Sequence, residues 1–63
     1  MFTLSFKTGN AAFEGADLGP EVALILRALA DRVEDMSAEE LPLDLNIYDS
    51  NGNRVGAATI KES

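Results

Sequence analysis

The chain has 63 residues, 46% of them hydrophobic, and eleven acidic against five basic side chains give it a formal net charge of −6. It contains no cysteine and no histidine, which excludes disulfides, thiolate zinc sites, thiol nucleophiles and a histidine general base. The excess of acids disfavours direct binding to nucleic acid or to an anionic membrane, because both require Lys and Arg. We therefore expect a single domain over 1–63 with a thin core.

The composition and the N-terminal pattern also indicate where in the cell the protein is expected. Secreted domains of this size usually carry disulfides, so their absence favours a cytoplasmic protein. No apolar run approaches the roughly 20 residues that span a bilayer. The N-terminus alternates in polarity and lacks a basic region, so we do not expect a signal peptide.

Residues 2–7 alternate strictly, which predicts a half-buried strand with Phe2, Leu4 and Phe6 on its buried face. Residues 8–19 show no period and hold three glycines, so they are expected to form a twelve-residue loop. Phe13 within this loop should tuck against the core. A loop of this length in so small a domain is either functional or a wrapped connection.

A helix is expected to begin at Gly19-Pro20-Glu21, because proline suits the first helical position and glutamate suits the positive end of the dipole. Apolar residues then recur at helical spacing and should form one buried stripe: Val22, Ile25, Leu26, Leu29, Val33 and Met36. Residues 36–40 end the helix in a short turn, where Ser37 and Glu40 match a capping box.

Residues 41–48 alternate and predict a second strand, in which Pro42 near the start favours an edge position. Asn51-Gly52 supplies the positive φ angles of a tight hairpin turn, and 54–60 follow as a third strand. The small residues at 56–58 would let a helix lie close over this strand, which places it in the middle.

These elements predict an α+β fold with the order β-α-β-β. The sheet is expected to be antiparallel, with three strands in the order 1-3-2 and the helix packed on one face. The other face meets solvent or a partner and carries Thr3, Ser5, Lys7, Asp44 and Asn46.

The negative charge is concentrated in one segment, residues 31–44, where six acids stand against Arg32 alone and hold five of the six net charges. The acids are Asp31, Glu34, Asp35, Glu39, Glu40 and Asp44. A solvated face that keeps the protein soluble needs no function, but acids at the C-terminal end of a helix oppose its dipole. We interpret the segment as an anionic surface for a basic, nucleic-acid-binding surface of a host protein.

Two further side chains are candidate contacts within such an interface. Leu24 lies opposite the apolar stripe on a helical wheel, and Tyr48 projects from the outer sheet face near the hairpin. An exposed leucine and a cross-strand tyrosine are also ordinary surface residues, so both interpretations stay open.

Residues 49–53 superficially resemble a calcium loop. The sixth position of an EF-hand loop would be Arg54 instead of glycine, and the twelfth would be Ile60 instead of glutamate. A carboxylate pair for glycoside hydrolysis needs a cleft, which a sheet with one helix lacks. We expect no metal site, no cofactor and no catalytic activity, while weak, nonspecific binding of divalent cations stays open.

The stretch F-K-T-G-N-A-A-F-E at 6–14 resembles the opening of very small proteins encoded by phages and mobile elements. The helix at 25–34 and the hairpin at 49–56 are similar to theirs as well. Some small acidic phage proteins are anti-CRISPRs that mimic DNA and block a type I effector complex, such as type I-C. The resemblance implies that role here, because size, charge and the lack of catalytic residues agree.

The leading hypothesis is thus a monomeric anti-CRISPR-like inhibitor whose acidic surface blocks the DNA-binding site of a CRISPR effector complex. One rival is a phage structural or assembly accessory that oligomerises through a sheet edge or Leu24. Another is a metal-binding or small-molecule-binding module. Salt dependence of binding separates the first two, and a melting temperature unchanged by Ca²⁺ would remove the third.

Overall fold

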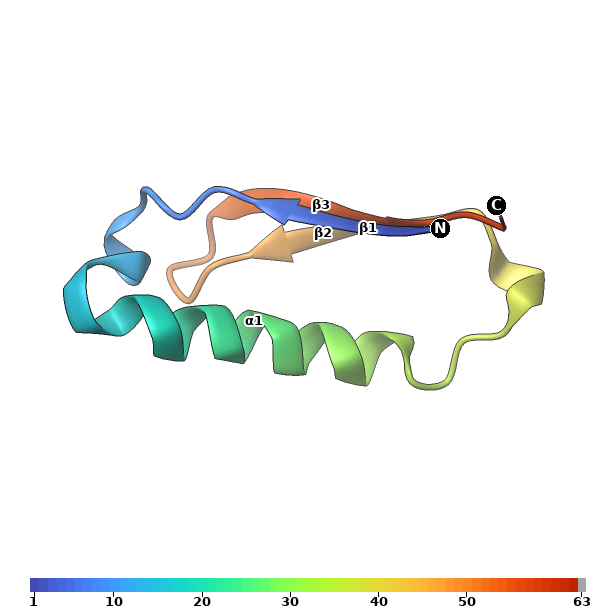
Figure 1. Ribbon diagram of the computed structural model, residues 1–63, viewed down its shortest axis with the longest axis horizontal. Helices are drawn as coiled ribbons and strands as arrows, with labels where there is room; N and C mark the ends of the chain where they lie inside the picture. The colour runs from blue at the N-terminus through green and yellow to red at the C-terminus, as the bar shows by residue number, and fades with distance from the viewer. Residues whose placement is uncertain (63) are drawn as a thin grey trace.

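The computed structural model describes residues 1–62. Three strands, β1 (Phe2–Phe6), β2 (Leu43–Tyr48) and β3 (Arg54–Ile60), form one antiparallel sheet in the order β1-β3-β2. A single long helix, α1 (Leu18–Val33), runs along one face of this sheet (Figure 1). The α+β class, the β-α-β-β order and the central place of the third strand are therefore confirmed.

The alternation of the strands decides which side chains meet the helix. Leu4 and Leu45 both pair with Ala58, and the three residues face α1, where Ala58 is completely buried. Within residues 1–62, the core holds six buried hydrophobic side chains: Phe13, Ile25, Leu29, Ile47, Val55 and Ala58. Such a core is thin, as the chain length predicts.

The buried stripe of the helix is largely as predicted. Ile25 and Leu29 are buried, and Val22 and Val33 pack against the core. The prediction was wrong for Leu26, which is 47% exposed, because it lies on a flank of the helix that a three-stranded sheet is too narrow to cover. Met36 follows the end of α1 at Val33 and is half-buried.

The segment predicted as a twelve-residue loop contains two short 3-10 helices, η1 (Ala11–Phe13) and η2 (Gly15–Asp17). Phe13 is buried and its ring lies 6.1 Å from that of Phe6, so the expected contact with the core is confirmed. The helix begins at Leu18, which places Pro20 third instead of first. Proline is tolerated there because the first four N–H groups of a helix have no partner within it.

A β-bulge interrupts the alternation where β3 begins. The register shifts between Ile47 and Tyr48, and Val55, which strict alternation would place outward, is buried. The next residue, Gly56, lies close against the backbone of β1. A Cβ atom there would lie 2.6 Å from Phe6 Cα. The sequence suggests that small residues here make room for the helix, but at position 56 the neighbour that requires glycine is β1.

Candidate functional site

The six acids of the segment 31–44 are all exposed. Asp31 lies in the last turn of α1, and Glu34 and Asp35 lie in the turn that follows it. Glu39 and Glu40 belong to the 3-10 helix η3 (Ala38–Glu40), at the same end of the molecule (Figure 1). The structure thus brings five of the six predicted acids to one end, which we call the acidic end.

Two of the six acids have structural partners. The Glu40 carboxylate accepts a hydrogen bond from the Ser37 N–H at 2.9 Å and so caps η3, as the capping-box pattern predicted. The Asp44 carboxylate accepts one from the Thr59 hydroxyl at 3.1 Å. Asp44 and Thr59 lie on the face of the sheet that points away from α1, so Asp44 does not share a surface with the other five acids.

Leu24 is 53% exposed on the solvent side of α1. It precedes Asp31 by two helical turns, with Ala28 between them, so the three side chains form one row along the helix. An apolar side chain and the acidic end therefore share a surface. Tyr48 is also exposed, but it pairs with Arg54 on β2 and β3 and lies on the opposite face of the sheet.

Arg32 does not neutralise the acidic end. It is the only base in the last turn of α1, and its Nη1 donates a hydrogen bond to the Asn46 carbonyl oxygen of β2 at 2.7 Å. The guanidinium is therefore directed at the sheet edge. The acids at the helix C-terminus stand against the negative end of the helix dipole.

The opposite end of the molecule is held by a buried carboxylate that sequence reasoning did not identify. Asp49 is only 5% exposed and accepts hydrogen bonds from the N–H groups of Asn51 and Asn53, both at 2.9 Å, and from Asn10 Nδ2 at 3.0 Å. The bond from Asn10 contributes most to lowering the pKa of Asp49 below its ordinary value of 3.8, while burial opposes this shift.

Glu21 ties the start of α1 to the same hairpin. It is 8% exposed, and its carboxylate accepts hydrogen bonds from the Ser50 N–H at 2.9 Å and from the Ser50 hydroxyl. A sequence signal for this existed: Glu21 precedes the buried Ile25 by four residues and thus belongs to the same helical row. An acid in that row indicates a buried, hydrogen-bonded carboxylate.

The calcium-like stretch 49–53 is therefore a turn whose acid points inward to backbone N–H groups. Gly52 supplies the positive φ of 83° that the turn requires. Among residues 1–62, no group of three or more Asp, Glu, His or Cys side chains lies close enough to hold a metal ion.

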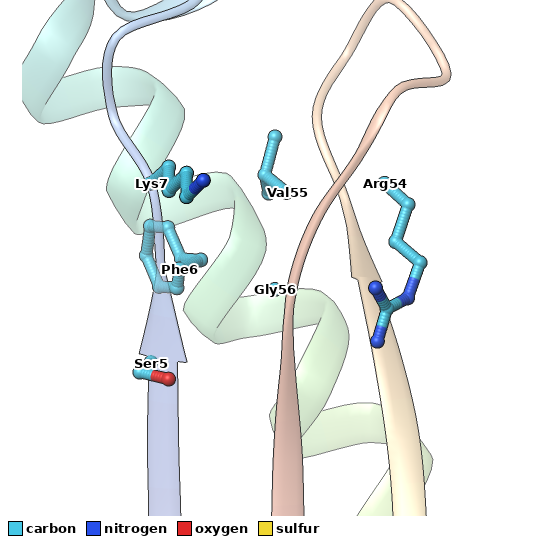
Figure 2. Close-up of a pocket in the computed structure, with 6 residues that line it drawn as sticks. All are labelled: Ser5, Phe6, Lys7, Arg54, Val55 and Gly56. Carbon is cyan, nitrogen blue, oxygen red and sulfur yellow. The ribbon is translucent and has the colours of Figure 1, made fainter.

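The face of the sheet that points away from α1 carries basic side chains, in contrast to the acidic end. Lys7 and Arg54 line a shallow hollow of about 420 Å³ together with Ser5, and Figure 2 shows these side chains on β1, β3 and the residue after β1. Arg54 Nε donates to Asn46 Oδ1 at 2.9 Å. Lys61 lines a second hollow with Thr3 and Thr59. Three of the five basic residues thus lie on this face.

No helix within residues 1–62 has the length and apolarity needed to cross a membrane. No protein-family model matches the chain, and neither the curated proteins nor the solved structures gave a match.

Proposed function

We propose that this protein is a non-enzymatic inhibitor that binds the DNA-binding site of another protein through the acidic end and the outward row of α1. The target we propose is a type I CRISPR effector complex, on the strength of the resemblance of 6–14 to small phage proteins. Inhibition follows from competition, since the carboxylates occupy the Lys/Arg-lined groove that DNA phosphates would otherwise fill.

One observation supports this proposal above the others: acids gather where the helix dipole disfavours them. Asp31, Glu34 and Asp35 lie at the C-terminus of α1, while Arg32, the one base in its last turn, donates to the sheet edge. Acids placed there reduce stability slightly. A basic partner would offset this cost, because its charges complement the surface and steer the encounter.

The adjacent leucine gives the surface an apolar contact. Charge complementarity mainly speeds association and selects partners, whereas buried side chains slow dissociation. Leu24 stands in the same helical row as Asp31 and is exposed. We assign it as the apolar anchor of the complex.

A charge-reversal experiment tests the proposal. The variant carries Asp31→Lys, Glu34→Lys and Asp35→Lys, and leaves Glu40 unchanged because that carboxylate caps η3. We expect it to lose competition with target DNA for a purified type I effector complex, measured by mobility shift. Wild-type protein should displace the DNA, and displacement should weaken steeply as salt increases.

The matched control adds the same six charges at the other end of the molecule, through Glu14→Lys, Asp17→Lys, Thr8→Lys and Ala16→Lys, all at exposed positions. Its net charge changes by the same amount, so it should still displace DNA if the position of the acids matters. Equal loss in both variants would mean that net charge alone is responsible. Undiminished competition by the first variant would refute the proposed surface.

A further inference from the structure

The two edges of the sheet are protected to different degrees. At the β2 edge, Pro42 precedes the strand, and the Arg32 guanidinium donates a hydrogen bond to the Asn46 carbonyl oxygen. Proline and charged side chains are the usual means by which a sheet edge is shielded from further pairing. The β1 edge has neither within Phe2–Phe6, and Figure 1 shows no segment lying over that strand.

The backbone of β1 has hydrogen-bonding groups that point away from the sheet. The Lys7 N–H donates to the Val55 oxygen, and the Lys61 N–H donates to the Met1 oxygen, each at 2.9 Å. Odd-numbered residues of β1 therefore bond to β3. Since successive residues of a strand direct these groups to alternate sides, the N–H and C=O groups of Phe2, Leu4 and Phe6 face the open edge.

The sequence of this strand, F-T-L-S-F, is symmetric in chemical type about Leu4. If a second copy paired antiparallel across a two-fold axis at Leu4, Phe2 would lie opposite Phe6, Thr3 opposite Ser5, and Leu4 opposite itself. Aromatic meets aromatic and hydroxyl meets hydroxyl in this register. The outward N–H groups of each copy also meet outward C=O groups of the other, because all three facing pairs involve even-numbered residues.

An apolar strip accompanies the open edge. Glu21 and Arg32 of α1 bond to Ser50 and Asn46, on the β2 side of the molecule. At 100° per residue Leu26 lies roughly 120–140° around the helix from both, which places it on the flank toward β1. Leu26 is 47% exposed and Phe2 is 49% exposed, so the flank and the strand both leave apolar surface uncovered beside the edge.

We infer that the β1 edge is a homodimer interface and that its occupant is β1 of a second copy of this chain. Pairing about Leu4 produces a continuous six-stranded antiparallel sheet with both helices on the same face. The contact is self-complementary, as a two-fold dimer requires. The interface uses neither the acidic end nor Leu24, so the dimer can be tested independently of the proposed inhibitory function. It would replace the monomer that the sequence led us to expect.

The test is the mass of the protein in solution, measured by light scattering over a wide concentration range. Wild-type protein should reach twice the chain mass of 6.7 kDa. Thr3→Lys with Ser5→Lys places like charges opposite each other on the solvent-facing side of the paired strands, and should give 6.7 kDa. Mixing this variant with a Thr3→Glu, Ser5→Glu protein should restore the dimer, since each lysine then faces a glutamate.

Two results would overturn the inference. The first is wild-type protein that remains at the chain mass at every concentration. The second is a dimer that persists in the Thr3→Lys, Ser5→Lys variant but is lost in the control Leu24→Lys, Ala28→Lys, which adds the same charge to the outward row of α1. Amide hydrogen exchange gives a readout without mutation: the Leu4 N–H should become protected as concentration rises, and unchanged exchange would count against the interface.

Discussion

At the scale of single residues, Asp49 and Glu21 have the same role in different elements. Each is a carboxylate with little exposure, and each accepts hydrogen bonds from the hairpin that joins β2 to β3. Charged acceptors are suited to turns because backbone N–H groups there have no strand partner. These two side chains fasten the hairpin to Asn10 on one side and to the start of α1 on the other.

The lowered pKa of Asp49 predicts an acid-sensitive contribution to stability. A carboxyl whose pKa is lower in the folded state stabilises the fold above its ordinary pKa of 3.8, and this contribution is lost as the pH falls through the folded-state value. Asp49→Asn should therefore be less stable than wild type at neutral pH, and the two free energies of unfolding should converge in strong acid. Urea unfolding over a pH series measures both.

Asn10→Ala serves as the second arm of that experiment. It removes the hydrogen bond that lowers the pKa of Asp49 most, so the acid-induced loss of stability should begin at higher pH than in wild type. Parallel pH curves for wild type and Asp49→Asn would show that Asp49 does not carry this pH dependence.

At the scale of elements, alternation and helical spacing predicted the three strands, their order and most of the buried helix face. These patterns report which side of an element is apolar, and that decides the packing of a small domain. They contain nothing about 3-10 turns, which have no apolar period, so η1 and η2 were missed. Alternation also does not reveal that Val55 is buried, because a β-bulge shifts the register where β3 begins.

The candidate site was predicted only in part, for a related reason. The segment 31–44 is continuous in sequence, but Asp44 lies on a strand, where side chains alternate between faces. It therefore points away from the helix and bonds to Thr59. Leu24, seven residues before Asp31, joins the acids because two helical turns bring it to the same row. Separation in sequence was thus a poor guide to which residues share a surface.

The position of the acids on α1 predicts opposite effects on stability and on binding. Asp31→Lys with Glu34→Lys should raise the melting temperature at low salt, corresponding to roughly 0.3–1 kcal/mol per group, because cations suit the helix C-terminus. The gain should shrink as salt is added. The same variant should bind its target less well, and melting curves at two salt concentrations would measure the first effect.

Acids near the N-terminus of α1 allow the converse experiment. Glu14→Lys with Asp17→Lys removes negative charge near the start of α1, where it is favourable, and should lower the melting temperature at low salt. If the variant at the C-terminus were also destabilised, the acids there would contribute to the fold, and the main support for the binding surface would be lost.

At the scale of the whole molecule, charge is separated by face as well as by end. The outward sheet face carries Lys7, Arg54 and Lys61 against a single acid, Asp44, so ten of the eleven acids lie elsewhere with two bases. The molecule is 39 Å long, several times the Debye length of about 10 Å at moderate salt. Lys7 and Arg54 lie together near the hairpin, at the end of the sheet opposite the acidic end. A basic partner therefore senses the acidic end and these two cations as separate regions.

This separation predicts that association and dissociation rates respond to different residues. Lys7→Gln with Arg54→Gln makes the net charge more negative without altering the acidic end, so association with the effector complex should accelerate at low salt while the dissociation rate stays unchanged. Leu24→Ala removes an apolar contact and no charge, so it should accelerate dissociation and leave association unchanged. Surface plasmon resonance at several salt concentrations resolves both rates. If Leu24→Ala slowed association instead, the leucine would contribute to the encounter and not to the bound complex, and its assignment as the anchor would have to be abandoned.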